Sequence, residues 1–496
     1  MSNMVQSPSL AGSETLRPTR GSAQRVGRNF LLLGVGKAGN LLLSFLVVTW
    51  LARRLRPEGF GLISFALALL SYFVVLAQGG LQLLGVREVA REPQRAAHYV
   101  RHIQGLQIAQ SLLAFLLMLV VAFLAPRSRL EKEILLLFGI TLLLYPFQLD
   151  WVLQGIERMG LLAAITFMQG AIYVSLVIWK VHSSEAVIWV PVAYLVGMAV
   201  QDVLLTTSVF RRFGFCLPSF DLTSMRSVLR TSLPMGFSMA MVAVYWNTGS
   251  VLLGFLRGNA HVGWYNAAIK IVMVLVAVPQ LYNQAMVPAI SALFVQSLPR
   301  LERLIAESLR LMALLVAPMM TGGIILAGKI IHFLYGDRYS PSVLTLRVLF
   351  VGVAIIYISF PLGSTALYSN RERLYMWAVA MGALVNVGVD ILLIPRLGGS
   401  GAAVATVLGE LVVFGLMYRA ANQVIRVRVL TRLWRPLLSC FPMTLSLVLS
   451  RNLALGWQVL LGALVYLVAV ALLGGLTKED LRVATSMVRS KASPVA

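Results

Sequence analysis

Residues 30–50 read FLLLGVGKAGNLLLSFLVVTW, an apolar stretch in which Lys37 is the one charged residue. A hydrocarbon core of roughly 30 Å takes about 20 apolar residues of helix to cross. The stretch is long enough for one crossing, and its flanks are polar. The sequence therefore predicts that residues 29–52 form a transmembrane helix.

Similar apolar stretches follow along the rest of the chain, separated by short hydrophilic segments. A composition of 58% hydrophobic and 12% charged residues is typical of a polytopic α-helical membrane protein. The predicted fold class is therefore all-α, with about fourteen transmembrane helices. The predicted spans are residues 29–52, 59–82, 103–125, 133–153, 161–181, 187–209, 231–256, 263–290, 311–335, 342–368, 374–394, 400–424, 434–450 and 455–476.

The formal net charge of +23 raises the question of a nucleic-acid partner. Nucleic-acid-binding proteins gather Lys and Arg on one soluble face, whereas here the basic residues stand between the apolar stretches. With an inside N-terminus and fourteen spans, 27 of the 42 basic residues fall in inside segments and 11 in outside segments. The positive-inside rule therefore predicts that both termini are cytoplasmic, and no nucleic-acid partner is expected.

An internal repeat divides the chain into two halves. A shift of 202 positions lays Gly61 on Gly263 and Gln82 on Gln284. Repeated six-helix halves are a transporter architecture with the substrate site between the halves. The predicted organisation is a disordered basic cytoplasmic tail at 1–28, an N-terminal six-helix lobe at 29–210, a cytoplasmic linker at 211–230, a pseudo-symmetric C-terminal six-helix lobe at 231–424, an additional helix pair at 425–476 and a cytoplasmic tail at 477–496.

No motif in the sequence supports enzymatic or metal chemistry. Residues 34–39, GVGKAG, match the G-x-G-x-x-G pattern, but that pattern needs a strand-turn-helix context and here lies inside a span. Small residues in a membrane helix more often allow close helix packing. Cys216 and Cys440 form no CxxC pair, and the five histidines are scattered. We expect no catalytic residue, no metal ion and no cofactor.

Polar residues inside the spans predict a hydrated cavity between the halves. Lys37 shares a helical face with Asn40, and Lys270 lies on a polar stripe of the eighth span. A charge at mid-bilayer costs on the order of 3 kcal/mol on insertion scales and normally faces a cavity or a partner. The predicted substrate-binding residues are Lys37, Asn40, Gln78, Gln82, Asn266, Lys270, Gln280 and Gln284.

The acidic residues inside the spans leave two interpretations open. Asp202 and Glu410 lie deepest, where they either neutralise the lysines in interhelical contacts or face the cavity themselves. In the second case, either could carry a coupling proton or sodium ion. Lys329, Asp390 and Arg347 lie near the ends of their spans, so their side chains are expected to reach the membrane interface.

Four stretches resemble the polysaccharide transporter family, the oligosaccharide-lipid flippases of the MATE-like superfamily. They are LARRLRPEGFG at residues 51–61, LGVREVAR at 84–91, DWVLQGIERM at 150–159 and LLIPRLGGSGAA at 392–403. Together with the span count, the resemblance covers essentially the whole chain. Residues 54–56, Arg-Leu-Arg, depart from the less basic Leu-Gly turn that the family commonly shows there.

The resemblance implies a bacterial cytoplasmic-membrane flippase for a polyprenyl-diphosphate-linked oligosaccharide, working by alternating access between two lobes. Other polysaccharide assembly proteins and the surrounding lipids are the further partners that it implies. On chemical grounds we assign the diphosphate to Lys37 and Lys270 as point charges, and the sugar hydroxyls to the amide side chains. The alternatives are a MATE-type small-molecule exporter, a membrane glycosyltransferase or polymerase, and a catalytically silent assembly scaffold.

Overall fold

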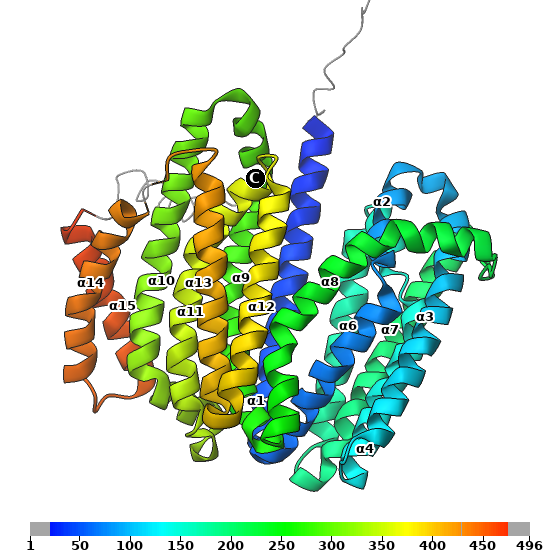
Figure 1. Cartoon of the computed structure of the whole chain (residues 1–496), viewed down its shortest axis with the longest axis horizontal. Coiled ribbons are helices and arrows are strands. Elements are labelled where there is room, and N and C mark those ends of the chain that lie inside the picture. The colour runs from blue at the N-terminus through cyan, green and yellow to red at the C-terminus, as the bar shows by residue number, and fades with distance from the viewer. Residues whose placement is uncertain (1–19, 428, 475–496) are drawn as a thin grey trace, which may run out of the picture.

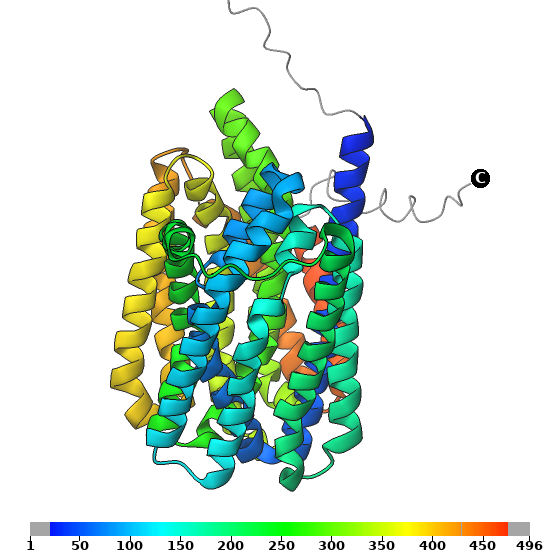
Figure 2. The same ribbon diagram turned by 90° about the vertical axis from the view of Figure 1, so that its right-hand side faces the viewer.

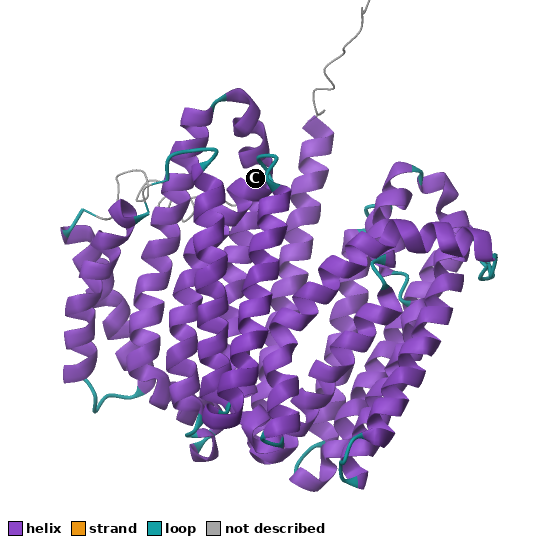
Figure 3. Ribbon diagram, in the orientation of Figure 1, coloured by secondary structure: helices purple, strands orange, loops and turns teal. Residues whose placement is uncertain are grey.

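The computed structural model describes residues 20–427 and 429–474, with side-chain positions defined except at residues 20–38, 40–42, 430 and 432. Within these ranges the regular structure is entirely helical (Figure 3). The α-helices are α1 (Arg20–Gln78), α2 (Leu81–Arg91), α3 (Ala96–Leu124), α4 (Arg129–Ile140), α5 (Asp150–Gly155), α6 (Met159–Lys180), α7 (Trp189–Phe213), α8 (Leu222–Leu256), α9 (Asn259–Gln296), α10 (Leu298–Tyr335), α11 (Ser342–Leu367), α12 (Glu372–Leu397), α13 (Gly399–Asn422), α14 (Leu430–Leu449) and α15 (Leu455–Leu472).

Every predicted span falls on helical structure, although the fourth, 133–153, is broken into α4, the 3-10 segment Thr141–Phe147 and α5. Twelve helical segments of the described chain are long and apolar enough to cross a membrane, and residues 433–449 form a shorter apolar helix. The first of the twelve counts two predicted spans as one, because α1 continues through a kink. The prediction of a polytopic all-α membrane protein is therefore confirmed. Residues 20–28, expected in the N-terminal tail, belong to α1, while residues 1–19 and 477–496 lie outside the described ranges.

The kink in α1 lies at Arg56, where φ is 61° and ψ is 174°. Pro57 follows, and a proline disfavours helical dihedrals at the residue before it. The first two predicted spans therefore form a helical hairpin with almost no loop. The left-handed φ at a non-glycine residue costs on the order of 1–3 kcal/mol.

Replacing Arg56 by glycine is expected to stabilise the protein, because glycine adopts this φ without a steric penalty. The free energy of unfolding should rise by about 1 kcal/mol, part of the relief being offset by the greater freedom of glycine in the unfolded chain. Thermal unfolding of the purified protein in detergent measures the effect. Arg54→Gly, two residues earlier within the helix, is the matched control and should lower the melting temperature.

Two of the family-like stretches pack against each other at the upper end of the N-terminal lobe in Figure 1. Trp151 of α5 is fully buried and its ring covers Gly85 of α2, where an added Cβ would lie 2.4 Å from the indole. Gly155 lies against Val89 in the same way, with a Cβ distance of 2.7 Å. The stretches at 84–91 and 150–159 therefore stabilise the fold, because they pack α2 closely against α5.

Helix α8 begins outside the membrane with a capped first turn. The carboxylate of Asp221 accepts hydrogen bonds from the backbone N–H groups of Thr223 and Ser224 and from the Ser224 hydroxyl, which together lower the pKa of Asp221. An Asp at this position satisfies N–H groups that the first helical turn leaves unpaired. From there α8 crosses obliquely, packing on α2 and α3 near its start and on α12 further along (Figure 1).

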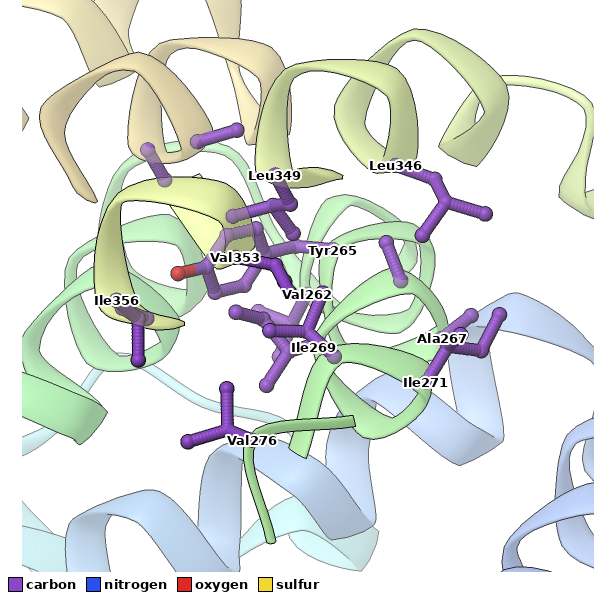
Figure 4. Close-up of a cluster of buried hydrophobic side chains, with 14 of the residues drawn as sticks. Val262, Tyr265, Ala267, Ile269, Ile271, Val276, Leu346, Leu349, Val353 and Ile356 are labelled. Atoms are coloured by element: carbon purple, nitrogen blue, oxygen red, sulfur yellow. The ribbon is translucent and has the colours of Figure 1, made fainter. Parts of the chain in front are cut away.

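The main core lies where α9 meets α1, α11 and α13. Figure 4 shows apolar side chains of α9 and α11 in mutual contact, including Val262, Ile269 and Val353. Tyr357 of α11 donates a hydrogen bond to the carbonyl of Leu275 on α9, at 2.7 Å. Burial of these faces fixes α9 between the two halves.

Helices α14 and α15 lie outside the two six-helix groups and contact α10 (Figures 1 and 2). Lys329 of α10 donates hydrogen bonds to the carbonyls of Arg451 and Leu453, in the turn between α14 and α15, and to the side chain of Gln458, at 2.6–2.8 Å. Lys329 was expected to reach the interface, and it instead fastens the α14–α15 turn. Arg347, also expected there, donates to the carbonyl of Ile324 at 3.2 Å.

Candidate functional site

The two halves meet at the lower face in Figure 1 through direct backbone contact. A Cβ added at Gly61 of α1 would lie 1.7 Å from the carbonyl oxygen of Asn259, and one at Gly263 of α9 would lie 2.1 Å from that of Pro57. Gly61 and Gly263 are the residues that the 202-position repeat lays on each other. The repeated glycines thus pack as a near-symmetrical pair, and this face is closed.

A buried charged cluster reinforces the closed face. Arg127, in the α3–α4 turn, lies 3.4 Å from Glu131 and donates to the Asn259 side chain at 3.4 Å and to the carbonyl of Gly254. Asn259 in turn donates to Glu131. The guanidinium lies 4.6 Å from the ring centroid of Phe65. These contacts connect the N-terminal half to the α8–α9 turn, and the Arg127 and Glu131 side chains are only 11% and 14% exposed.

Replacing Arg127 by glutamine is expected to loosen the closed face, because Glu131 loses its positively charged partner in a largely buried position. The expected cost is about 2 kcal/mol, which shifts the population about thirtyfold toward conformations open at this face. Spin labels at residues 182 and 340 should report a longer distance between the halves. Arg129→Gln is the matched control: Arg129 also pairs with a glutamate four residues on, at 2.9 Å, but its side chain is 94% exposed. Equal distances in both variants would contradict the role of Arg127.

Above the closed face, two cavities with mixed apolar and polar linings flank α8, whose Val242 and Trp246 line both. The N-side cavity, of about 560 Å³, lies between α1, α7, α8 and the 3-10 segment Thr141–Phe147. Its polar lining is Ser71, Gln78, Tyr145, Tyr194, Ser238, Trp246 and Asn247. The C-side cavity, of about 220 Å³, lies between α8, α9, α11, α12 and α13. Its polar lining is Tyr245, Trp246, Gln280, Asn283, Ser359, Ser364, Tyr375 and Glu410.

Hydrogen bonds order the wall of the C-side cavity. The hydroxyl of Tyr245 on α8 donates to the carboxylate of Glu410 on α13. Across the cavity, the hydroxyl of Ser364 on α11 donates to the side-chain oxygen of Asn283 on α9. The cavity therefore presents amides, hydroxyls and one carboxylate, a lining able to bond neutral polar groups or a cation.

The predicted binding residues are distributed unevenly over these cavities. Gln78 lines the N-side cavity and its repeat partner Gln280 lines the C-side cavity. Gln284 is exposed one turn beyond Gln280. Gln82 falls outside both linings, since it lies beyond the glycine break in the short helix α2. The two repeat-related glutamines thus occupy corresponding places in the two halves.

Asn266 serves the packing of α9 rather than a cavity. Its side-chain N–H group donates to Ser250 of α8 at 3.0 Å and to the carbonyl of Val262 at 3.1 Å, and the residue is 7% exposed. In this conformation Asn266 therefore makes an interhelical hydrogen bond to Ser250 in place of the predicted contact with cargo.

Lys270 lies seven residues beyond Gly263 on α9, which places it on the helix face turned toward α1. It is half-buried and, within the described ranges, makes no hydrogen bond or ion pair. Neither Asp202 nor Glu410 pairs with it. Lys37 and Asn40 lie on the first half of α1, and their side chains fall outside the described ones.

The acidic residue that sequence reasoning misplaced is Asp390. It was expected at the interface, yet it is 1% exposed in α12, and neither carboxylate oxygen has a hydrogen-bond partner within the described ranges. Asn386, one turn earlier on the same face, also has an unpartnered side-chain oxygen. Tyr265 of α9 lies beside Asp390 and Thr406. The spacing of Asn386 and Asp390 at i and i+4 in an apolar helix was the available signal.

Asp202 of α7 is a buried carboxylate in the N-terminal half. It is 3% exposed, and both of its oxygens are unpartnered among the described residues. Tyr145 and Tyr194, which line the N-side cavity, lie near it. Each half therefore buries a carboxylate close to tyrosines of its cavity: Asp202 in the first and Glu410 in the second.

Comparison with solved structures supports the fold. The chain superposes on the lipid II flippase MurJ in an inward closed conformation with a TM-score of 0.74, 14% identity and coverage of 89% of this chain and 98% of MurJ. An inward-facing multidrug resistance MATE family transporter matches with a TM-score of 0.65, 13% identity and coverage of 77% and 94%. At these identities the likeness concerns the fold, which is that of MurJ and the MATE transporters.

Sequence relatives point to polysaccharide assembly. A candidate O-antigen transporter of Escherichia coli is 22% identical over 398 residues, covering 79% of this chain and 95% of the relative. A candidate O-antigen transporter of Shigella dysenteriae is 23% identical, with coverage of 80% and 100%. The polysaccharide biosynthesis protein family matches residues 26–294, more than half of the chain. The chain therefore belongs to the polysaccharide biosynthesis protein family, and it is a multi-pass membrane protein.

Proposed function

We propose that the protein flips a polyprenyl-diphosphate-linked oligosaccharide, the repeat unit of an O-antigen, capsule or exopolysaccharide, across the bacterial cytoplasmic membrane by alternating access. The observation that carries the proposal is the pair of cavities beside α8, which hold amide and hydroxyl groups in a mainly apolar lining and lie above a face closed by the Gly61–Gly263 contact. The names of the relatives in E. coli and S. dysenteriae support this class of cargo.

The distribution of basic residues supports a cytoplasmic location for the upper face in Figure 1, because α1 begins there and the inside segments hold most of the Lys and Arg. We propose that both termini lie on the cytoplasmic side. With the opposite face sealed by the glycine pair and the Arg127 cluster, the conformation is the one that receives cargo from the cytoplasm. Release on the other side requires that these contacts separate.

Cargo recognition follows from the chemistry of its parts. The diphosphate is anionic, and an ammonium group is a suitable point-charge partner. Lys270 is unpaired among the described residues and lies on the face of α9 turned toward α1. Lys37 is proposed to act with it from the first half of α1. Gln78, Asn247 and Gln280 are proposed to bond sugar hydroxyls from the cavity walls, while the prenyl chain remains in the lipid.

Lys270→Ala is expected to reduce transport at least about tenfold, because a charge-assisted bond to the diphosphate contributes about 1.5–3 kcal/mol. Flipping of a fluorescent polyprenyl-diphosphate oligosaccharide in proteoliposomes measures this. Lys270→Arg should retain most of the activity, since it keeps the charge. Lys180→Ala is the matched control, because Lys180 lies over the ring of Trp179, 3.9 Å from its centroid, at the end of α6. Wild-type flipping by Lys270→Ala would remove this lysine from the mechanism.

Export of a small organic cation is the second candidate, and the Glu410 carboxylate in the C-side cavity is the observation that favours it. The two functions predict opposite charge dependence. A cation exporter should lose activity in Glu410→Gln and gain or keep it in Lys270→Ala. Uptake of a fluorescent cation and flipping of the oligosaccharide lipid, measured in the same proteoliposomes, distinguish them.

A further inference from the structure

A third cavity lies away from the two beside α8, between the upper parts of α10 and α14. It has a volume of about 430 Å³ and is lined by three arginines: Arg310 of α10, Arg426 after α13 and Arg435 of α14. Glu302 and Glu307 are the acidic residues in the same lining, so the charge of the wall is net positive. Trp434 adds an aromatic ring, a residue type enriched at the membrane interface.

Two of the arginines are held in place by contacts within the wall. Arg310 donates from Nε to Glu307 at 2.8 Å, and its side chain is 16% exposed. Arg435 donates from Nη1 to the carbonyl of Gly474 at 2.6 Å and lies over the ring of Trp434, 5.1 Å from its centroid. A guanidinium has five N–H donors, so Arg435 keeps donors for an anion. The cavity thus presents oriented cationic groups at the level of lipid headgroups.

An apolar cavity of about 300 Å³ adjoins the arginine-lined one at Pro436, which lines both. The apolar cavity lies between α10, α11, α13 and α14. Along α10 the lining passes from Arg310 in the first to Val316 and Met320 in the second, and along α14 from Arg435 to Leu437. The lining changes from charged to hydrocarbon within a few residues.

We propose that these two adjoining cavities bind an anionic phospholipid, with the headgroup phosphate at Arg426 and Arg435 beside the Arg310–Glu307 pair and one acyl chain in the apolar cavity. Basic pockets between transmembrane helices on the cytoplasmic side suit anionic headgroups. An amphiphile is the ligand that matches both cavities at once: a free phosphate would leave the apolar cavity empty, and a neutral lipid would bring no negative charge to Arg426 and Arg435.

The bound lipid would join α14 and α15 to the C-terminal half. The direct apolar packing there is one small cluster, in which Cys440, Met443 and Tyr466 contact Ala317 and Leu326 of α10. Hydrogen bonds from Lys329 to the α14–α15 turn and from the Tyr466 hydroxyl to the carbonyl of Leu314 add to it. A phospholipid wedged between α10 and α14 adds contacts at the cytoplasmic end of the same interface. This role is structural and does not depend on the identity of the cargo.

The test measures lipid binding by the purified full-length protein, with native mass spectrometry and thermal unfolding in detergent. Phosphatidylglycerol should bind and raise the melting temperature, whereas phosphatidylethanolamine should not. Arg426→Gln and Arg435→Gln should each weaken phosphatidylglycerol binding about fivefold. Ala354→Phe, which fills the apolar cavity and keeps all three arginines, should weaken it as well. Arg396→Gln and Arg451→Gln, at the opposite face, are the matched controls and should bind as the wild type does.

Several outcomes would overturn the proposal. Equal binding of phosphatidylglycerol and phosphatidylethanolamine would exclude headgroup recognition. Wild-type binding of phosphatidylglycerol by Ala354→Phe would show that no acyl chain occupies the apolar cavity. Competition by inorganic phosphate alone would reduce the site to an anion site. Preferential binding of undecaprenyl phosphate would assign the two cavities to the cargo lipid instead. These measurements involve no transport, so their outcome does not decide whether the protein is a flippase.

Discussion

A single methyl group at Gly61 or Gly263 is expected to abolish most transport. In the conformation described here, a Cβ at Gly61 would lie 1.7 Å from a backbone carbonyl oxygen of α9, and one at Gly263 would lie 2.1 Å from that of Pro57. Backbone on both sides leaves no flexible side chain to move aside. Overpacking of this kind costs about 1–3 kcal/mol, and the whole cost falls on the conformation closed at this face.

Alternating access requires both conformations to be populated, so Gly61→Ala should reduce flipping about tenfold or more while the protein remains folded. The spin-label pair at residues 182 and 340 should show the lobes apart at the lower face. Gly328→Ala is the matched control: Gly328 lies within α10, and an added Cβ there meets nothing within 4 Å. Normal flipping by Gly61→Ala, with unchanged label distances, would show that this contact is not part of the cycle.

Asp390→Asn is expected to uncouple transport from an ion gradient. Two carboxylate oxygens of Asp390 and the amide oxygen of Asn386 are buried and unpartnered among the described residues, close to Tyr265 and Thr406. A buried charge without a partner is strongly unfavourable. We therefore expect a proton or a sodium ion to neutralise it during transport, which adds Asp390 to the coupling candidates Asp202 and Glu410.

In proteoliposomes, an imposed proton or sodium gradient should accelerate flipping by the wild type. In Asp390→Asn the acceleration should disappear, with flipping reduced to the rate seen without a gradient, while the melting temperature stays the same or rises because a buried charge has been removed. Asp337→Asn is the matched control, since Asp337 lies beyond the end of α10, its side chain is 86% exposed and it pairs with His332. Retained gradient response in Asp390→Asn, with loss in Asp202→Asn or Glu410→Gln, would move the coupling site to those residues.

The first hairpin shows how a local sequence departure acquires a structural meaning. In the sequence, residues 54–56 depart from the less basic Leu-Gly turn that the resembled family commonly shows. At that level the departure concerns only the positive charge of the hairpin. The structure places Arg56 at a φ of 61°, a conformation that glycine adopts at low cost. The departure therefore has a second effect besides the added positive charge: it introduces backbone strain at the kink between the first two spans.

The polar residues show where sequence reasoning reached its limit. Gln78 and Gln280 were chosen because amides are rare in apolar helices, and both line cavities. Asn266 was chosen for the same reason, yet it bonds Ser250 of a neighbouring helix. An amide side chain can line a cavity or bond a neighbouring helix, and only the position of α8 decides which of the two it does.

The sequence by itself determined the membrane fold. Hydrocarbon cannot hydrate a backbone, so each apolar stretch of sufficient length becomes a helix whose hydrogen bonds are internal, and the repeat identified the glycines at which the halves meet. The tertiary structure decided which face is closed, which polar groups reach a cavity and that Asp390 is buried. These properties depend on the rotation and tilt of each helix against its neighbours, and packing between distant segments sets them.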